Sequence, residues 1–104
     1  MARTSKIIYI QNMDVNMVLD VVNQILTGNG YMEKMVGNEH VWAKGDGVII
    51  KMQCFGVTFR EDGVILQGWL KDAITGESDL TCFVASQMKK KMLQIMKEIE
   101  MVLV

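Results

Sequence analysis

The chain has 104 residues, half of them hydrophobic and 22% charged, with a net charge of −1. These values fit one domain, 1–104, and exclude an intrinsically disordered chain or one whose overall charge would attract nucleic acid or anionic lipid. The two cysteines are too few for a disulfide framework, so we expect free thiols, although two cysteines also permit one bridge. No apolar run reaches the ~20 residues of a membrane span, and no signal-peptide layout is present, so we expect a cytoplasmic location.

The first third of the chain predicts a strand followed by an amphipathic helix. Lys6–Ile10 is a β-branched and aromatic run that is typical of a strand. Asp14 then caps a helix, because its carboxylate can accept hydrogen bonds from the free amides of a first turn. Gly28-Asn29-Gly30 ends this helix, since glycine and asparagine tolerate the left-handed backbone of a helix end. The helix has one apolar stripe at helical spacing, made of Met17, Val18, Val21, Val22, Ile25 and Leu26.

From Tyr31 onward the hydrophobic period changes to two, which predicts strands. Tyr31–Val36 and His40–Lys44 are expected to form a hairpin around Gly37-Asn38. A long strand, Val48–Arg60, follows the next turn. Gly56 leaves two alternatives open: a bulge or bend, which glycine in a strand interior often marks, or an unbroken alternation through the strand.

The strongest hairpin signal comes after the long strand. Glu61-Asp62-Gly63 is the turn, and Val64–Leu70 is the returning strand. If the alternation through the long strand is unbroken, Phe55 and Phe59 share one face of the sheet. Trp69 lies on the same face of the returning strand as Ile65 and Gln67. Whether the alternation is unbroken at Gly56 decides which aromatic side chains are exposed.

The last third predicts a polar loop and a long helix. Lys71–Leu80 is rich in polar residues and contains Gly76-Glu77-Ser78-Asp79. The helix extends from about Phe83 to Val104, and at 1.5 Å per residue it would be ~33 Å long, enough to cross a sheet of four or five strands. Its apolar face consists of Met88, Met92, Ile95, Met96, Ile99 and Leu103.

The element order is therefore β-α-β-β-β-β-α, which predicts an α+β domain. The short connections favour a mostly antiparallel sheet of about five strands, with the long C-terminal helix packed across one face. The other face must meet solvent or a partner. This order resembles the TBP-like arrangement, which the helix-grip folds extend with further elements. A resemblance of topology implies a fold and does not imply a function.

Several short motifs from about Gly45 onward carry a second resemblance. They are Gly45-Asp46-Gly47, Phe59-Arg60-Glu61-Asp62-Gly63-Val64-Ile65, Gly68-Trp69-Leu70, Glu77-x-Asp79-Leu80, Lys90-Lys91 and Ile99-Glu100. The pattern is similar to a small uncharacterised bacterial domain that sometimes sits behind a zinc ribbon in longer proteins. The resemblance implies a sheet with a trailing helix and no known activity or ligand. This chain has no zinc-ribbon cysteines, so no role tied to that ribbon is carried over.

Few residues suggest catalysis or metal binding. A cysteine–histidine pair would make a thiolate nucleophile if His40, the only histidine, lay beside Cys54 or Cys82. A metal site needs three or four convergent ligands, and these three residues lack C-x-x-C or H-x-x-x-H spacing. The turns Gly45-Asp46-Gly47 and Gly76-Glu77-Ser78-Asp79 are acidic but lack the regularly spaced oxygen ligands of a calcium loop. We therefore predict no catalytic, metal-binding or cofactor-binding residue, no cofactor and no enzyme activity.

Lys89-Lys90-Lys91 is the only dense basic run. On a helix, three successive residues spread over about 200°, so they form no single patch, although with Arg60 and Lys71 they would flank a phosphate-binding strip. The slightly acidic net charge and the 7% aromatic content differ from the footprint of nucleic-acid-binding proteins. The three lysines are the anion-contact candidates of an alternative function, nucleic-acid or phosphate binding.

The remaining candidates concern interfaces. Trp42 and Trp69 would mark an interface if they were exposed on the open face of the sheet, and a dimer would cover the apolar end Met101-Val102-Leu103. Because the apolar content exceeds what one modest core needs, we predict a non-catalytic protein-interaction or self-association module with a homo-oligomeric or protein partner. The alternative is a carrier with a cavity between the C-terminal helix and the sheet, where some of the ten methionines would suit a small apolar ligand.

Overall fold

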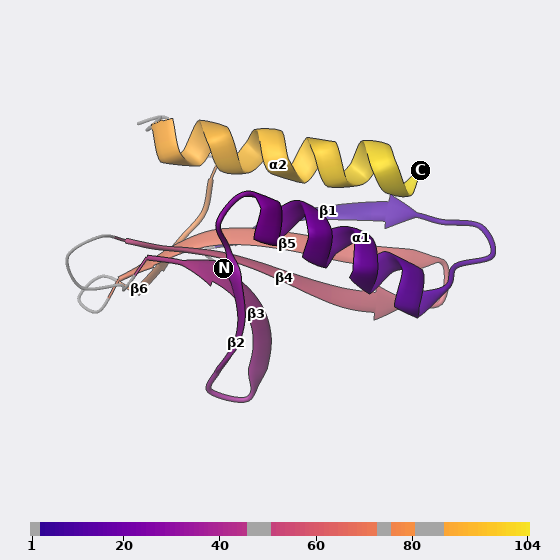
Figure 1. The fold of residues 1–104 in the computed structure, drawn as a ribbon, viewed down its shortest axis with the longest axis horizontal. Helices are drawn as coiled ribbons and strands as arrows, with labels where there is room; N and C mark the ends of the chain where they lie inside the picture. Colours follow the sequence, from indigo (N-terminus) through magenta and orange to yellow (C-terminus); the bar gives the residue numbers. More distant parts are fainter. Residues whose placement is uncertain (1–2, 46–50, 73–75, 81–86) are drawn as a thin grey trace.

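The computed structural model describes residues 3–45, 51–72, 76–80 and 87–104. Within these residues it confirms an α+β domain, with an antiparallel sheet of six strands and two helices, the longer of them at the C-terminus (Figure 1). In chain order the elements are β1 (Thr4–Tyr9), α1 (Val15–Gly28), β2 (Met32–Val36), β3 (Glu39–Lys44), β4 (Met52–Arg60), β5 (Gly63–Asp72), β6 (Gly76–Ser78) and α2 (Gln87–Leu103).

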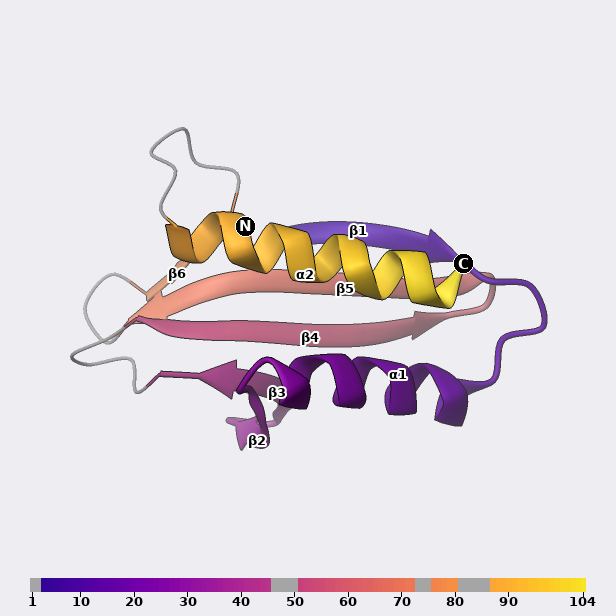
Figure 2. The ribbon, with the colours of Figure 1, turned by 45° about the horizontal axis from the view of Figure 1, so that its top comes forward.

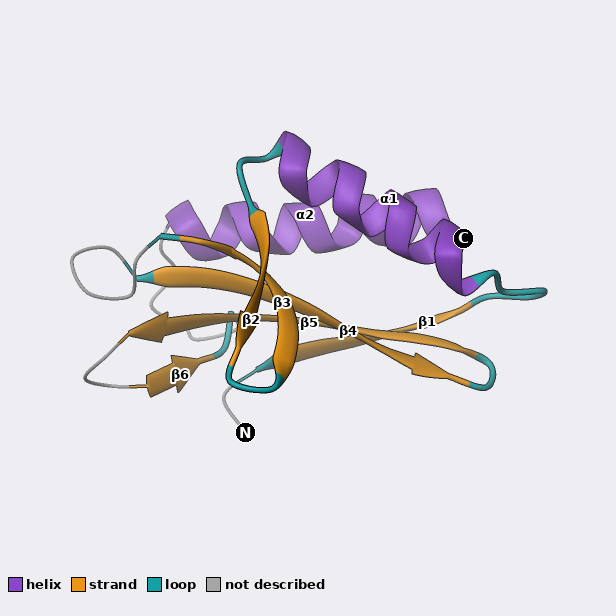
Figure 3. Cartoon of the chain, turned by 60° about the horizontal axis from the view of Figure 1, so that its bottom comes forward, coloured by secondary structure: helices purple, strands orange, loops and turns teal. Residues whose placement is uncertain are grey.

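The sheet places the first strand beside the fifth. Its order is β1-β5-β4-β3-β2, and every neighbouring pair is antiparallel. β6 pairs with the last residues of β5, beyond β1, so β1 and β6 follow one another along the same side of β5. Both helices lie on one face of the sheet (Figure 3). Figure 2 shows α2 over β5 and β1, with α1 on the side of β3.

The segment Lys71–Leu80 differs from the predicted loop. β5 continues to Asp72, and Gly76–Ser78 forms the short strand β6. Three residue pairs join β6 to β5 in antiparallel register. Backbone pairing with a neighbouring strand therefore outweighs the turn-rich composition of this segment, because the strand preference of a residue depends on its context.

Gly56 marks no bulge, so of the two alternatives the structure has the unbroken strand. The register between β4 and β5 runs without a break along the whole of β4. A Cβ atom at Gly56 would lie 3.3 Å from Cη2 of Trp69, so the missing side chain makes room for the indole ring that lies against the strand.

The ends of α1 follow the prediction. Asp14 Oδ1 accepts hydrogen bonds from the backbone N–H groups of Asn16 and Met17, at 3.0 and 3.4 Å. At the other end, the N–H of Tyr31 donates to the carbonyl of Leu26 at 3.0 Å and turns the chain into β2.

The helices and one face of the sheet enclose the main core. β4 contributes Phe55, Val57 and Phe59 to this core, as unbroken alternation predicts. The apolar stripe of α2 is confirmed, because its central members belong to the same cluster and are 0–7% exposed; they are Met92, Ile95, Met96, Ile99 and Leu103.

A second, smaller cluster lies on the face of the sheet opposite the helices, which we call the open face. Its buried members come from β3, β4 and β5, and they are Val41, Ala43, Cys54 and Trp69. Val36 and Met52 pack against them. A sheet with only one face under helices thus buries apolar side chains on both faces.

Gly63 is required by the close approach of β1. A Cβ atom at this position would overlap the carbonyl oxygen of Ile8. We expect Gly63→Ala to lower the free energy of unfolding by about 3 kcal/mol, because backbone atoms cannot rotate away from the clash. Gly28→Ala is the matched control, since no atom lies within 4 Å of a Cβ there. Urea unfolding followed by circular dichroism measures both, and equal stabilities would contradict the assignment.

Candidate functional site

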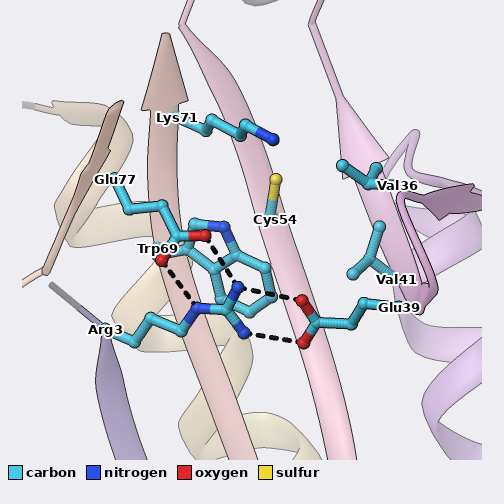
Figure 4. A pocket seen from close by; sticks show the side chains of 8 residues that line it. All are labelled: Arg3, Val36, Glu39, Val41, Cys54, Trp69, Lys71 and Glu77. Carbon is cyan, nitrogen blue, oxygen red and sulfur yellow. Dashed lines mark hydrogen bonds and ion pairs between the residues drawn. The ribbon is translucent and has the colours of Figure 1, made fainter. Parts of the chain in front are cut away.

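The open face carries a hydrogen-bond network centred on Arg3 (Figure 4). Its Nε and Nη2 atoms donate to the Glu77 carboxylate at 2.8 and 2.7 Å, and Nη1 and Nη2 donate to Glu39 at 2.7 and 2.9 Å. Nη1 also donates to Gln67 Oε1 at 3.3 Å. A guanidinium has five N–H groups, so these contacts use all of them.

The guanidinium of Arg3 also stacks on Trp69. Its Cζ lies 3.6 Å from the centroid of the indole ring, which is the geometry of a cation–π contact. Trp69 belongs to β5, Glu39 to β3 and Glu77 to β6. The side chain of Arg3, the residue before β1, therefore contacts three other strands. The side chain of Arg3 is only 14% exposed.

The network changes the acidity of its members. Hydrogen bonds from Arg3 hold the pKa of Glu39 and the pKa of Glu77 below the usual carboxyl value. The same hydrogen bonds raise the pKa of Arg3 itself. Both carboxylates and the guanidinium are therefore charged at neutral pH.

A pocket of about 170 Å³ lies beside the Arg3–Trp69 stack. Its apolar wall is formed by Val36, Val41 and Cys54. Figure 4 shows Lys71 extending over this wall, with its ammonium group near the Cys54 sulfur. Burial raises the pKa of the Cys54 thiol to about 11, so the thiol is neutral at pH 7 and a poor nucleophile.

The histidine and cysteine residues that cysteine–histidine chemistry would require do not lie together in the described structure. His40 packs on Trp42 with ring centroids 4.8 Å apart, and its Nε2 lies 2.8 Å from Glu33 Oε2. Cys54 lies on the opposite face of the sheet, and Cys82 is outside the described residues. In the described part of the chain, no three His, Cys, Asp or Glu side chains gather as a metal site.

The basic residues proposed for anion binding, Lys89–Lys91 with Arg60 and Lys71, do not form one patch either. Lys89–Lys91 occupy the first turns of α2, where Lys90 and Lys91 are exposed and Lys89 is half-buried. Lys71 is on the open face, whereas α2 covers the other face. Arg60 lies at the far end of β4 and pairs with Asp62 of the turn at 3.2 Å.

The predicted interface residues divide into two groups. Trp42 and Trp69 are 1% and 2% exposed and belong to different clusters on the two faces of the sheet. Leu103 is also buried. Met101 and Val102 are 69% and 56% exposed, so only this part of the set offers its side chains to another molecule.

The Arg3 network has no signature in the sequence pattern. Arg3 precedes the predicted first strand, and Glu77 lies in the segment predicted as a loop. The hydrogen bonds from Arg3 to Glu39 and Glu77 span 36 and 74 positions in the chain. No local period links residues so far apart, and only the pairing of β1 and β6 with β5, and of β5 with β4 and β3, brings them together.

No protein-family model, curated protein or solved structure matches this chain. The side-chain geometry therefore carries the functional argument. Neither helix in the described ranges has the length and apolar character needed to cross a membrane.

Removal of the Arg3 guanidinium is expected to destabilise the domain. In Arg3→Met, the aliphatic stem still covers Trp69, but two partly buried carboxylates lose their partner. We expect the free energy of unfolding to fall by about 2 kcal/mol, below the range for fully buried pairs because both carboxylates are partly exposed. Arg60→Met is the control, because its exposed pair with Asp62 is expected to contribute about 0.5 kcal/mol. Equal losses in urea unfolding would show that the network is not structural.

The same network predicts acid sensitivity. Because the folded-state pKa of Glu39 and of Glu77 is depressed, their stabilisation is complete above the ordinary carboxyl value of 4.5 and is lost as the pH falls through the depressed values. The urea midpoint of the wild-type chain should therefore drop between about pH 5 and pH 3. Arg3→Met should show a smaller drop over this interval, and parallel curves for the two proteins would contradict the assignment.

Proposed function

We propose that this chain is a non-catalytic self-association module, in which two copies join along β1 and the adjoining side of α2. The observation that carries the proposal is a set of exposed and half-buried apolar and charged side chains along one edge of the domain, whose order would complement itself on rotation by 180°. We call this set the β1–α2 edge. It consists of Ile7 and Tyr9 on β1 and of Leu93, Lys97, Glu100 and Val104 on or just after α2.

β1 supports the proposal because it is the edge strand of the sheet. An edge strand presents unpaired backbone groups that another strand can pair with. On its open face, Ile7 is 43% exposed and Tyr9 is 64% exposed. β-branched and aromatic side chains contribute favourable direct and diagonal contacts in a strand pair, so this edge suits pairing with a second strand.

α2 continues the same edge above the sheet. Leu93 and Lys97 line a groove with the first residues of β1, and Val104 lines a second groove with Tyr9. Glu100 lies between these grooves and pairs with Lys6 at 2.8 Å. The four α2-side residues recur at intervals of four, three and four, which places them on one side of a helix.

A two-fold axis perpendicular to the sheet at Ile7 pairs two β1 strands in antiparallel register. Ile7 then faces Ile7 of the second copy, and Ser5 faces Tyr9, with no like charges opposite each other. The same rotation reverses α2. It sets Lys97 opposite Glu100 of the second copy and Leu93 opposite Val104, so the helix row offers opposite charges at its centre and apolar contacts at its ends.

The other edge of the sheet is less suited to self-association. β2 exposes Met32 and Met35, which are 71% and 62% exposed. Its central residue is Lys34, however, so a two-fold axis there would set Lys34 against its own copy. Like charges directly opposite each other destabilise a strand pair, and charged residues on edge strands oppose edge-to-edge pairing.

The two alternative functions have less support from the described residues. A carrier needs space under α2, yet a Cβ atom at Gly68 would already lie 3.0 Å from Leu80 and 3.1 Å from Met96 Sδ. Anion binding at Lys89–Lys91 needs side chains that converge, and successive residues of a helix diverge.

Self-association predicts concentration-dependent mass. In sedimentation velocity, the wild-type chain should approach twice its 11.8 kDa mass as its concentration rises over roughly 10–500 μM, where small transient interfaces dissociate. Val104→Asp should shift the dimerisation midpoint to at least about tenfold higher concentration, because it places a carboxylate against Leu93 of the second copy. The change is on an 81% exposed side chain, so the fold should be unaffected.

Met101→Asp is the matched control on the same helix. Met101 is 69% exposed but lies outside the row, so its dimerisation midpoint should equal that of the wild-type chain. Lys97→Glu, which opposes two carboxylates across the axis, should weaken the dimer, whereas Lys90→Glu should not. A strictly monomeric wild-type chain would refute the proposal. Loss of the dimer in Met101→Asp alone would place the interface on the outer face of α2 and also refute it.

A further inference from the structure

We propose that the pocket on the open face binds a small carboxylate-bearing molecule, held by the Trp69 indole N–H and the Lys71 ammonium. This inference is independent of self-association, because the pocket is lined by Arg3 and by residues of β2 to β6, and none of them belongs to the β1–α2 edge.

Trp69 supplies a hydrogen-bond donor without a partner. The side chain is 2% exposed, and its Nε1 is the one buried side-chain nitrogen or oxygen in the described residues that makes no hydrogen bond. Trp42, the other tryptophan, donates its indole N–H to Asn23 Oδ1 at 3.1 Å. An unpaired buried donor is costly, so a ligand oxygen that accepts from Trp69 would recover a full hydrogen bond.

The orientation of the indole directs this donor into the pocket. The far corner of the ring, Cη2 and Cζ3, lies over Gly56. The nitrogen is on the opposite side of the ring, toward Cys54 and Lys71 (Figure 4). Arg3 covers one face of the ring, and the N–H group, whose nitrogen is itself buried, lies on the side of the ring that borders the pocket.

Lys71 supplies the positive charge. Among the described residues it makes no ion pair, although Glu77 is its direct cross-strand neighbour. Both Glu77 and Glu39 direct their carboxylates to Arg3, whose five N–H groups are all occupied. The charges of Arg3, Lys71, Glu39 and Glu77 sum to zero, and because both carboxylates are hydrogen-bonded to Arg3, the Lys71 ammonium is the pocket cation that pairs with no carboxylate in the described residues.

The walls limit what such a ligand can be. Val36, Val41 and the neutral Cys54 thiol present apolar surface opposite the two donors. The volume of about 170 Å³ corresponds to a few water molecules at about 30 Å³ each, so the pocket has room for a short aliphatic body and one carboxylate. A short-chain carboxylate therefore matches the charge, the donors and the size together.

The test uses butyrate and the two tryptophan indole resonances of the ¹⁵N-labelled chain. Sodium butyrate should shift the Trp69 indole N–H in a saturable manner, with a dissociation constant on the order of 1 mM for so small a ligand. The Trp42 indole should stay in place and report that the fold is intact. Butyramide, which has the same shape without the charge, and sodium chloride at equal ionic strength are the ligand controls.

Two lysine variants test the contact. Lys71→Met keeps the aliphatic stem and should weaken butyrate binding by about tenfold or more, as expected for loss of a charged hydrogen bond. Lys90→Met removes the same charge from the exposed face of α2 and should leave the affinity unchanged. Val104→Asp should also retain binding, which separates this inference from the dimer.

Three results would overturn the inference. The first is an indole of Trp69 that does not respond to butyrate or responds without saturation. The second is an equal response to butyramide or chloride, which would show that the pocket does not select for a carboxylate. The third is equal butyrate affinity in Lys71→Met and Lys90→Met. Selective loss in Lys71→Met, with the Trp42 resonance unchanged, would support it.

Discussion

The alternation of side chains along β5 is the constraint on which the rest of the structure depends. β5 pairs with β1, β4 and β6. Its residues Val64, Leu66 and Leu70 pack in the core under the helices. Trp69 points the other way, into the cluster on the open face. A slip of one residue would exchange these two sets, so the core under α2 and the Arg3–Trp69 stack are fixed by the same register.

The two faces of the sheet are stabilised by different physical effects. Under the helices, burial of apolar area dominates, and the stripe of α2 packs closely against β5 around Gly68. On the open face, a few apolar side chains lie beneath one guanidinium that satisfies two carboxylates. The ion pairs of Arg3 reach β3 and β6, and its contacts with Gln67 and Trp69 reach β5, so one side chain ties together the strands around the pocket.

The proposed surfaces occupy different parts of this architecture. The β1–α2 edge lies where the sheet ends at β1, beside α2, so association there would extend the sheet without covering its open face. The pocket lies within the sheet surface between Trp69 and Lys71. A dimer of this kind would carry two such pockets on one continuous face, and each pocket would be complete within its own copy of the chain.

Much of the fold was predictable from local patterns. The cap at Asp14, the apolar stripe of α2 and the common face of Phe55 and Phe59 follow from hydrogen-bonding groups or periods within a few residues of one another. β6 was not predictable, because its strand conformation comes from pairing with β5. The TBP-like resemblance and the resemblance to a bacterial domain remain predictions from the sequence.

The sequence by itself thus determined the class of the domain and the side of α2 that is buried, because both depend on local periodicity. Tertiary structure decided what surrounds Trp69. It placed Gly56 beneath the ring and Arg3 above it, and it left the indole N–H facing Lys71. These contacts join residues from distant parts of the chain, and only the order and register of the strands set their distance from one another.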